Sequence, residues 1–263
     1  MGTLYLIPDP ARLEASCALS DRYRACFEYN DFYMPDLLDD PAALRERIAL
    51  YRSLGREPGR DTMHGAFFDV IVHSDDPLIR AVGARRVEQS MEVATALGVR
   101  GVVFHTGAIA TFFSNAYDEN WVRANRAFWS DVCARYPGIQ VFMENMFDTR
   151  YSLMLALAKE MTDVPNFGIC LDYSHAGIFG KDPAAWLNAL APYVRHIHVN
   201  DHDGRSDLHA PIGTGVTDWA VFERAVSGAG IDPSILIETR SLENWEQSAG
   251  FLSQNGIFPF DRK

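Results

Sequence analysis

A short apolar run recurs along this chain roughly every 33 residues, and that spacing constrains the fold more than any other feature. Each run has the length of a buried strand, and an amphipathic helical pattern follows most of them. The runs TLYLI, ACFEY, DTMHG, GVVFH, IQVFME, FGICLD, RHIHVN and ILIET begin near Thr3, Ala25, Asp61, Gly101, Ile139, Phe167, Arg195 and Ile235. Eight strand–helix units predict an α/β fold, a (β/α)8 TIM barrel that forms a single domain over residues 1–263.

Helical periodicity fills the intervals between the runs. The predicted helices cover residues 14–20, 41–55, 77–97, 119–136, 151–161, 183–191, 218–228 and 242–254. Prolines at 41, 77 and 183 suit first helical turns, and Gly98 suits a helix C-terminus. An open, doubly wound sheet is the less favoured alternative, because no glycine-rich phosphate loop follows the first strand.

Charge and cysteine content limit the class of partner and compartment. The net charge of −11 argues against an extended phosphate-binding surface, so nucleic acid is not expected as a partner. The four cysteines form no C-x-x-C pair, which favours reduced thiols in a cytoplasmic protein and argues against a thiolate zinc site. No apolar stretch approaches the ~18 residues of a membrane span. The sequence leaves open whether copies of the chain form a homo-oligomer.

Side chains that commonly bind metals stand at the ends of the predicted strands. From the third strand to the eighth they are His64, His105, Glu144, Asp172, His198 and Glu238. Strand alternation directs Glu144 and Asp172 inward, and inward side chains at the carboxyl ends of barrel strands converge on one pocket. Carboxylates gathered without matching Lys or Arg repel one another, so a divalent cation is expected among them. The mixture with imidazoles suits Zn, Mn, Fe or Co better than Ca.

Other polar residues have simpler interpretations. His196 lies two residues before His198 on the same face and is expected to be a hydrogen-bonded core histidine. His73 lies in a polar loop and is expected to be solvated. Glu28 ends the second strand on its inward side, where an ion pair and a substrate contact are equally good interpretations. Aromatic residues after the strand ends, such as Phe67, suit either a pocket wall or loop packing.

These residues resemble the xylose-isomerase-like TIM-barrel superfamily, which includes sugar isomerases, sugar epimerases and apurinic endonucleases of the endonuclease IV type. The strongest resemblance runs from His198 to Gly215, where a His is followed by Asp207-Leu-His209 and then by Pro-Ile-Gly-Thr-Gly. Asp172-Tyr-Ser-His175 is similar to the Asp-x-x-His of the sixth strand. The segments His105-Thr-Gly, Met143-Glu144-Asn and Ile237-Glu238-Thr match the remaining strands.

The resemblance implies two arrangements of metal ions. In the isomerase and epimerase branch, one divalent ion (Zn, Mn or Co) would be held by Glu144, Asp172, His198 and Glu238. In the endonuclease branch, three zinc ions would be held by these four residues together with His64, His105, His175, Asp207 and His209. The chain supplies every one of these additional metal or substrate ligands, so the ligand set does not separate the branches.

Features outside the ligand set favour the sugar branch. The loop at 31–40 is acidic, and the fourth strand ends in His-Thr-Gly where the endonucleases usually have His-Pro-Gly. The resemblance then implies a sugar or sugar-phosphate isomerase or epimerase. Glu144 and Glu238 would transfer protons next to a carbonyl, His175 would contact a substrate oxygen, and Arg205 would hold a distal hydroxyl or phosphate. The alternatives are a zinc phosphodiesterase acting on abasic DNA and a non-catalytic barrel that binds a sugar.

Overall fold

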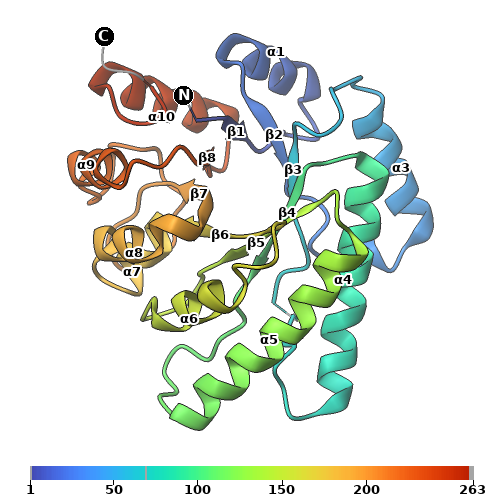
Figure 1. Ribbon diagram of the computed structural model, residues 1–263. Helices are drawn as coiled ribbons and strands as arrows, with labels where there is room; N and C mark the ends of the chain where they lie inside the picture. Colours follow the sequence, from blue (N-terminus) through green and yellow to red (C-terminus); the bar gives the residue numbers. More distant parts are fainter. Residues whose placement is uncertain (1, 69, 261–263) are drawn as a thin grey trace.

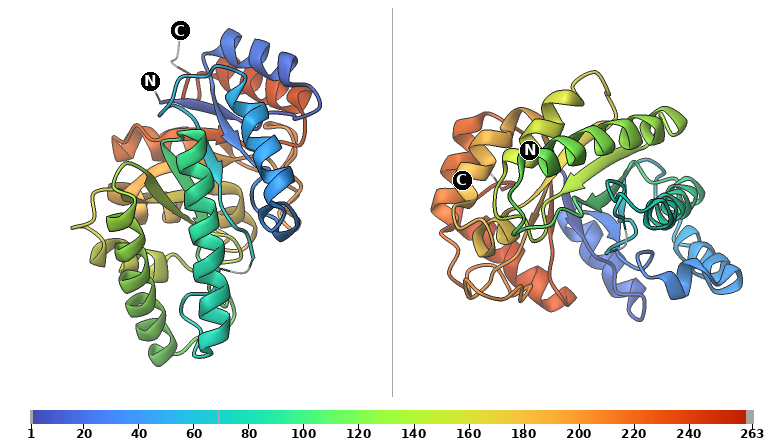
Figure 2. Two further views of the ribbon diagram at one scale, coloured as in Figure 1. Left: turned by 90° about the vertical axis from the view of Figure 1, so that its right-hand side faces the viewer. Right: turned by 90° about the horizontal axis from the view of Figure 1, so that it is seen from below.

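Eight parallel strands close into a barrel in chain order, and helices surround it (Figures 1 and 2). The computed structural model describes residues 2–68 and 70–260. The strands are β1 (Leu4–Leu6), β2 (Cys26–Tyr29), β3 (Thr62–His64), β4 (Gly101–His105), β5 (Gln140–Glu144), β6 (Phe167–Asp172), β7 (Val194–Val199) and β8 (Ser234–Ile237). Pairing of β1 with β8 completes the ring. The predicted (β/α)8 fold is confirmed.

The helices largely follow the predicted pattern. They are α1 (Leu13–Tyr23), α2 (Pro35–Leu38), α3 (Pro41–Arg52), α4 (Pro77–Leu97), α5 (Asn115–Arg135), α6 (Ser152–Glu160), α7 (Tyr173–Ile178), α8 (Pro183–Leu190), α9 (Trp219–Ala229) and α10 (Leu242–Asn255), with a 3₁₀ turn η1 (Ala191–Tyr193). The sequence did not predict α2 and α7, which are too short for a helical period to appear. Within the described residues, no helix is long and apolar enough to cross a lipid bilayer.

Helix ends show why these segments begin and stop where they do. Asp40, Asp76 and Asp182 each cap a helix that starts with proline, and their carboxylates accept hydrogen bonds from first-turn N–H groups. Gly98 ends α4 with a φ of 73°, a left-handed conformation that favours glycine. The predicted roles of these prolines and of Gly98 are confirmed.

Side chains on the two faces of the strands pack into different apolar layers, one outside the barrel and one inside it. Outward residues, among them Met143 and Leu171, join the large apolar layer between the strands and the helices. Inward residues form two small apolar clusters inside the barrel, one of Tyr5, Cys26 and Leu236 and the other of Val103, Phe142 and Cys170. The predicted parity is therefore correct. It directs the last inward residue of each strand toward the open end of the barrel at the carboxyl ends of the strands, which we call the mouth.

Candidate metal and active site

The end of β5 lies at the centre of the mouth, where Glu144 contacts three histidines. Its Oε1 is 3.0 Å from His198 Nδ1, and its Oε2 is 3.3 Å from both His64 Nε2 and His105 Nε2. Register brings these groups together, because His105 pairs with Glu144 across β4 and β5. The structure thus unites the ends of β3, β4, β5 and β7 around one buried carboxylate.

A second donor group shares Glu144 with the first. One ligand atom each from Glu144, Asp172, His198 and Glu238 lies within 4.8 Å of the others. Glu238 Oε2 is 3.5 Å from His198 Nδ1, so both glutamates face the same imidazole nitrogen. Asp172 pairs with His198 across β6 and β7. The four residues expected to hold one divalent ion are therefore adjacent and buried.

A third group forms at the rim, beyond β6 and β7. Asp207 Oδ2 is 2.9 Å from His209 Nε2 and 3.4 Å from His175 Nε2. His209 has a φ of 47°, unusual outside glycine, which turns its ring back toward Glu238. All nine residues named for the two metal arrangements thus line one mouth.

Asp201 folds the loop that carries Asp207 and His209. Its backbone exchanges two hydrogen bonds with Ala210, and its carboxylate accepts from Gly213 N, Thr217 N and Trp219 Nε1. A Cβ at Gly215 would lie 2.4 Å from Asp201 Oδ1 and 2.3 Å from the His202 carbonyl oxygen, so this approach requires glycine. The Pro-x-Gly-x-Gly segment therefore serves loop geometry.

Several histidines are held so that Nε2 faces the donor groups. His64 Nδ1 lies 3.0 Å from the Gly65 carbonyl oxygen, and His175 Nδ1 lies 3.0 Å from that of Asn145. His209 Nδ1 lies 3.3 Å from the Glu238 carbonyl oxygen. A carbonyl accepts only from N–H, so Nδ1 carries a proton, and Nε2 is the nitrogen that would bind a metal after giving up its own proton.

The pKa values of the buried groups at the mouth show that positive charge is favoured next to the carboxylates. Burial alone would raise the pKa of Glu144, but His198, His105 and His64 hold it well below its usual range. Burial would lower the pKa of His198, yet Cys170, Glu144 and Glu28 raise it well above the ordinary value. Burial, opposed by His175 but reinforced by Glu144, raises the pKa of Asp172 to about 7. Imidazolium protons thus balance the carboxylates.

Unsatisfied buried atoms show that a divalent cation fits here. Among the described residues, Glu144 Oε2, Asp172 Oδ2, Glu238 Oε2 and His198 Nδ1 are buried without an aligned hydrogen bond. Such orphaned atoms are costly unless something else satisfies them. Oxygen and imidazole donors converging on one point are what Zn, Mn or Co prefers. The residues present therefore fit the metal that the resemblance implies.

One expectation about an individual residue is wrong. His73 is only 6% exposed, because its ring packs against Tyr117 and Trp121 of α5, and burial lowers its pKa to about 4. Cysteine is also present near the imidazoles, since ligand atoms of Cys170, His196 and His198 lie within 4.8 Å of one another. Spacing along the sequence could not show either proximity, which depends on packing between elements distant in the chain.

The structure also places the other residues that the sequence singled out, and it confirms the expectation for His196. His196 is a hydrogen-bonded core histidine, with Nδ1 2.7 Å from Ser234 Oγ and Nε2 3.0 Å from Glu28 Oε2. Glu28 is fully buried and forms the ion-pair contacts of a structural residue. Phe67 contributes to the mouth, its ring centroid 4.4 Å from that of His105. Arg205 is exposed in the loop after β7, where its backbone N–H donates to Asp203.

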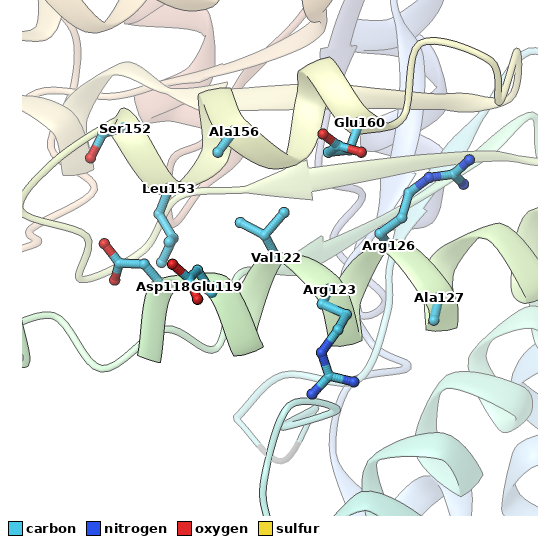
Figure 3. Close-up of a pocket in the computed structure, with 10 residues that line it drawn as sticks. All are labelled: Asp118, Glu119, Val122, Arg123, Arg126, Ala127, Ser152, Leu153, Ala156 and Glu160. Atoms are coloured by element: carbon cyan, nitrogen blue, oxygen red, sulfur yellow. The ribbon is translucent and has the colours of Figure 1, made fainter. Parts of the chain in front are cut away.

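A large pocket lies elsewhere, between α5 and α6 on the outside of the barrel (Figure 3). Its volume is about 700 Å³, and Val122, Ala127, Leu153 and Ala156 supply its apolar lining. Two of its charged residues are engaged, Asp118 with Arg150 and Arg126 with Asp163. The pocket therefore lacks the converging donor atoms that distinguish the mouth.

Comparisons with known proteins agree with the fold. Residues 25–255 match the family model described as xylose isomerase-like TIM barrel. The chain is 27% identical over 232 residues to a ketose 3-epimerase of Arthrobacter globiformis, covering 82% of this chain and 72% of that protein. It is 24% identical over 238 residues to a probable endonuclease 4 of Halorhodospira halophila, covering 81% and 79%.

A solved structure is similar over nearly the whole chain. The TTHB071 protein from Thermus thermophilus, soaked with ZnCl₂, is 26% identical, with a TM-score of 0.71 and coverage of 97% of each chain. The family match spans most of this chain, and its members include both epimerases and endonucleases. The chain belongs to the xylose isomerase-like TIM barrel family.

Proposed function

We propose that this protein is a divalent-metal-dependent sugar or sugar-phosphate isomerase or epimerase. The observation that carries the proposal is the placement of two carboxylates from opposite parts of the barrel, Glu144 on β5 and Glu238 after β8, around one imidazole nitrogen. Two carboxylates that flank one substrate carbon can remove a proton on one face and return it on the other. Similarity to the ketose 3-epimerase supports this class of substrate.

The residues of the mouth have separate tasks in such a reaction. Glu144, Asp172, His198 and Glu238 would hold the metal, which when bound supplies Lewis-acid stabilisation of negative charge on a carbonyl oxygen. Glu238 Oε2 is buried and lacks an aligned hydrogen bond, so it is placed to accept a proton from carbon. Glu144, in its protonated form, would deliver a different proton to the other face, and proton exchange with solvent would then restore both carboxyl groups.

Two further residues would orient the substrate. His175 stands at the mouth with Nε2 toward Asp207, where an imidazole can donate to a substrate oxygen. Arg205, exposed on the loop after β7, would hold a distal hydroxyl or phosphate. Asp31 engages Arg47, and Asp39 engages Arg85 and Arg86, and this pairing of the guanidinium groups supports a sugar over a DNA backbone as the ligand.

The test is a panel of ketoses, ketose phosphates and keto-glycosides, assayed with the metal-free chain and with added Mn, Co or Zn. We expect solvent deuterium to enter the substrate carbon next to the carbonyl, and only when metal is added. Metal-saturated protein that exchanges no deuterium into any member of the panel would contradict the proposal.

A second candidate is a zinc phosphodiesterase, and one observation favours it. His64 and His105 form a donor group with Glu144, and His175, Asp207 and His209 form another, so the mouth can supply ligands for three ions. Metal content after loading separates the candidates. About one ion per chain favours the isomerase, and about three zinc ions with cleavage of abasic duplex favour the phosphodiesterase.

A further inference from the structure

His198 differs from three other histidines of the mouth in what lies behind its ring. His64, His175 and His209 have their outer nitrogen against a backbone carbonyl. Behind His198, Nε2 lies 3.0 Å from Oε1 of Glu28, a side-chain carboxylate from β2. The ring therefore stands between the donor group at its Nδ1 and a second, deeper carboxylate at its Nε2.

Glu28 is tied in place on its other oxygen. Thr62 Oγ1 donates to Oε2 at 2.7 Å, and His196 Nε2 lies 3.0 Å from the same oxygen. Glu28 and both histidines are completely buried. Oε1 is thereby left for His198, and neither Oε1 nor His198 Nε2 has an aligned hydrogen bond elsewhere in the described residues. Two buried polar atoms in this state, 3.0 Å apart, are each other's partner after a small ring rotation.

We propose that Glu28 is a positioning residue that fixes the orientation and the tautomer of His198. An ionised carboxylate only accepts, so His198 carries its proton on Nε2 and presents the Nδ1 lone pair to Glu144, Asp172 and Glu238. This inference rests on the metal site proposed above and assigns that site a buried carboxylate behind its histidine ligand. Carboxylate partners of this kind orient a ligand imidazole and raise its basicity, and their loss typically weakens metal affinity about 10–100-fold.

The first measurement is the affinity of the full chain for Zn and Co by competition with a chelator. Glu28→Gln keeps the size but gives only one acceptor oxygen, which cannot serve both His196 and His198, so we expect affinity to fall about 10–100-fold. Glu28→Asp keeps the charge and withdraws it by one methylene, and a smaller loss is expected. Thr62→Val is the matched control, because it removes a hydrogen bond from Oε2 and leaves Oε1 facing His198.

The second measurement reads the tautomer directly. In zinc-loaded protein with ¹⁵N-labelled histidine, the signal lost in His198→Gln identifies His198. We expect its Nε2 to carry a proton that is shifted downfield by the carboxylate and protected from exchange. In Glu28→Gln and Glu28→Asp that proton should move upfield and exchange faster, a change that general loosening of the barrel would not confine to one ring.

The outcomes separate this inference from the site on which it rests. If Asp172→Asn binds metal as tightly as the unaltered chain, the proposed site itself fails. If Asp172→Asn loses affinity while both Glu28 variants keep it and leave the His198 signal unchanged, only the role of Glu28 fails. Should Glu28→Gln not fold, Glu28→Asp decides by the same signal. A thiolate-to-cobalt charge-transfer band abolished by Cys170→Ser would also overturn the role, because Glu28 would then be a ligand of a deeper ion.

Discussion

The same strands contribute two layers of buried side chains inside the barrel. The layers differ in the chemistry of their side chains and in how their polar atoms are satisfied. The lower layer contains Phe142 and Cys170, and the upper layer contains Glu144 and Asp172, only two residues farther along β5 and β6. In the lower layer Phe142 and Cys170 pack with Val103 in an apolar cluster. In the upper layer buried atoms remain without aligned partners. Residues that pack in the apolar core and residues of the proposed metal site are thus only two positions apart along the same strand.

The comparison predicts that substitutions in the upper layer can abolish activity while the protein remains folded. In Glu238→Gln we expect turnover to fall about 10²–10⁴-fold and to stay low when excess metal fills the site, because the variant lacks the carboxylate that we propose transfers the proton. The thermal midpoint should change little. Glu246→Gln, on the exposed face of α10, is the control. Full recovery of turnover at saturating metal would reduce Glu238 to a metal ligand.

The lower layer should behave in the opposite way. Phe142 is completely buried and stacks on His196 with ring centroids 5.5 Å apart. Phe142→Ala removes a large side chain from a closed barrel, so we expect the free energy of unfolding to fall by about 3–5 kcal/mol. The protein that remains folded should bind zinc with nearly unaltered affinity. Urea unfolding and chelator competition measure the two effects, and a large loss of affinity would show that the layers are coupled.

A buried histidine outside both layers sharpens the comparison through pH. Burial lowers the pKa of His73 to about 4, below the value of about 6.5 expected in the unfolded chain. As pH falls through 6.5, the unfolded chain binds this proton first, so stability is lost between about pH 6.5 and 4.

His73→Phe removes that titration and keeps the ring that packs on Tyr117 and Trp121. Between pH 7.5 and 5 the unaltered chain should lose about 1–2 kcal/mol more than the variant. Denaturant unfolding at both pH values gives the difference. Equal losses would place the acid sensitivity in other groups, the upper-layer carboxylates included.

The smallest expected effect concerns nucleic acid. The net charge is −11, and Arg47, Arg85 and Arg86 are engaged by Asp31 and Asp39 near the mouth. Binding to abasic duplex should therefore be weak at physiological salt and scarcely stronger than to intact duplex. A tight complex with a steep salt dependence, measured by fluorescence anisotropy, would favour the phosphodiesterase.

The features that the sequence predicts correctly are those that depend on the spacing of residues close together in the chain. The strand-end position of Glu144 and its inward parity follow from alternation along one strand, and the roles of Pro77 and Gly98 follow from backbone chemistry. Helix α7 escaped prediction because six residues cannot display a period of 3.6. The burial of His73 and the contact of Glu28 with His198 depend on α5 and on the register of β2 against the rest of the barrel. Such packing between distant segments leaves no local pattern.

The pairing of β1 with β8 ties completion of the donor group to the order of synthesis. Leu4 pairs with Ile235, and Trp245 Nε1 donates to the Tyr5 carbonyl oxygen at 2.9 Å. On a ribosome the first seven strands emerge before β8, so Glu238 joins Glu144, Asp172 and His198 only after the ring can be sealed. If the proposed ion needs all four ligands, it would bind the closed barrel and not the incomplete one, and this binding would shift the equilibrium toward the closed form. Metal supply would then influence how many newly made chains reach the closed form.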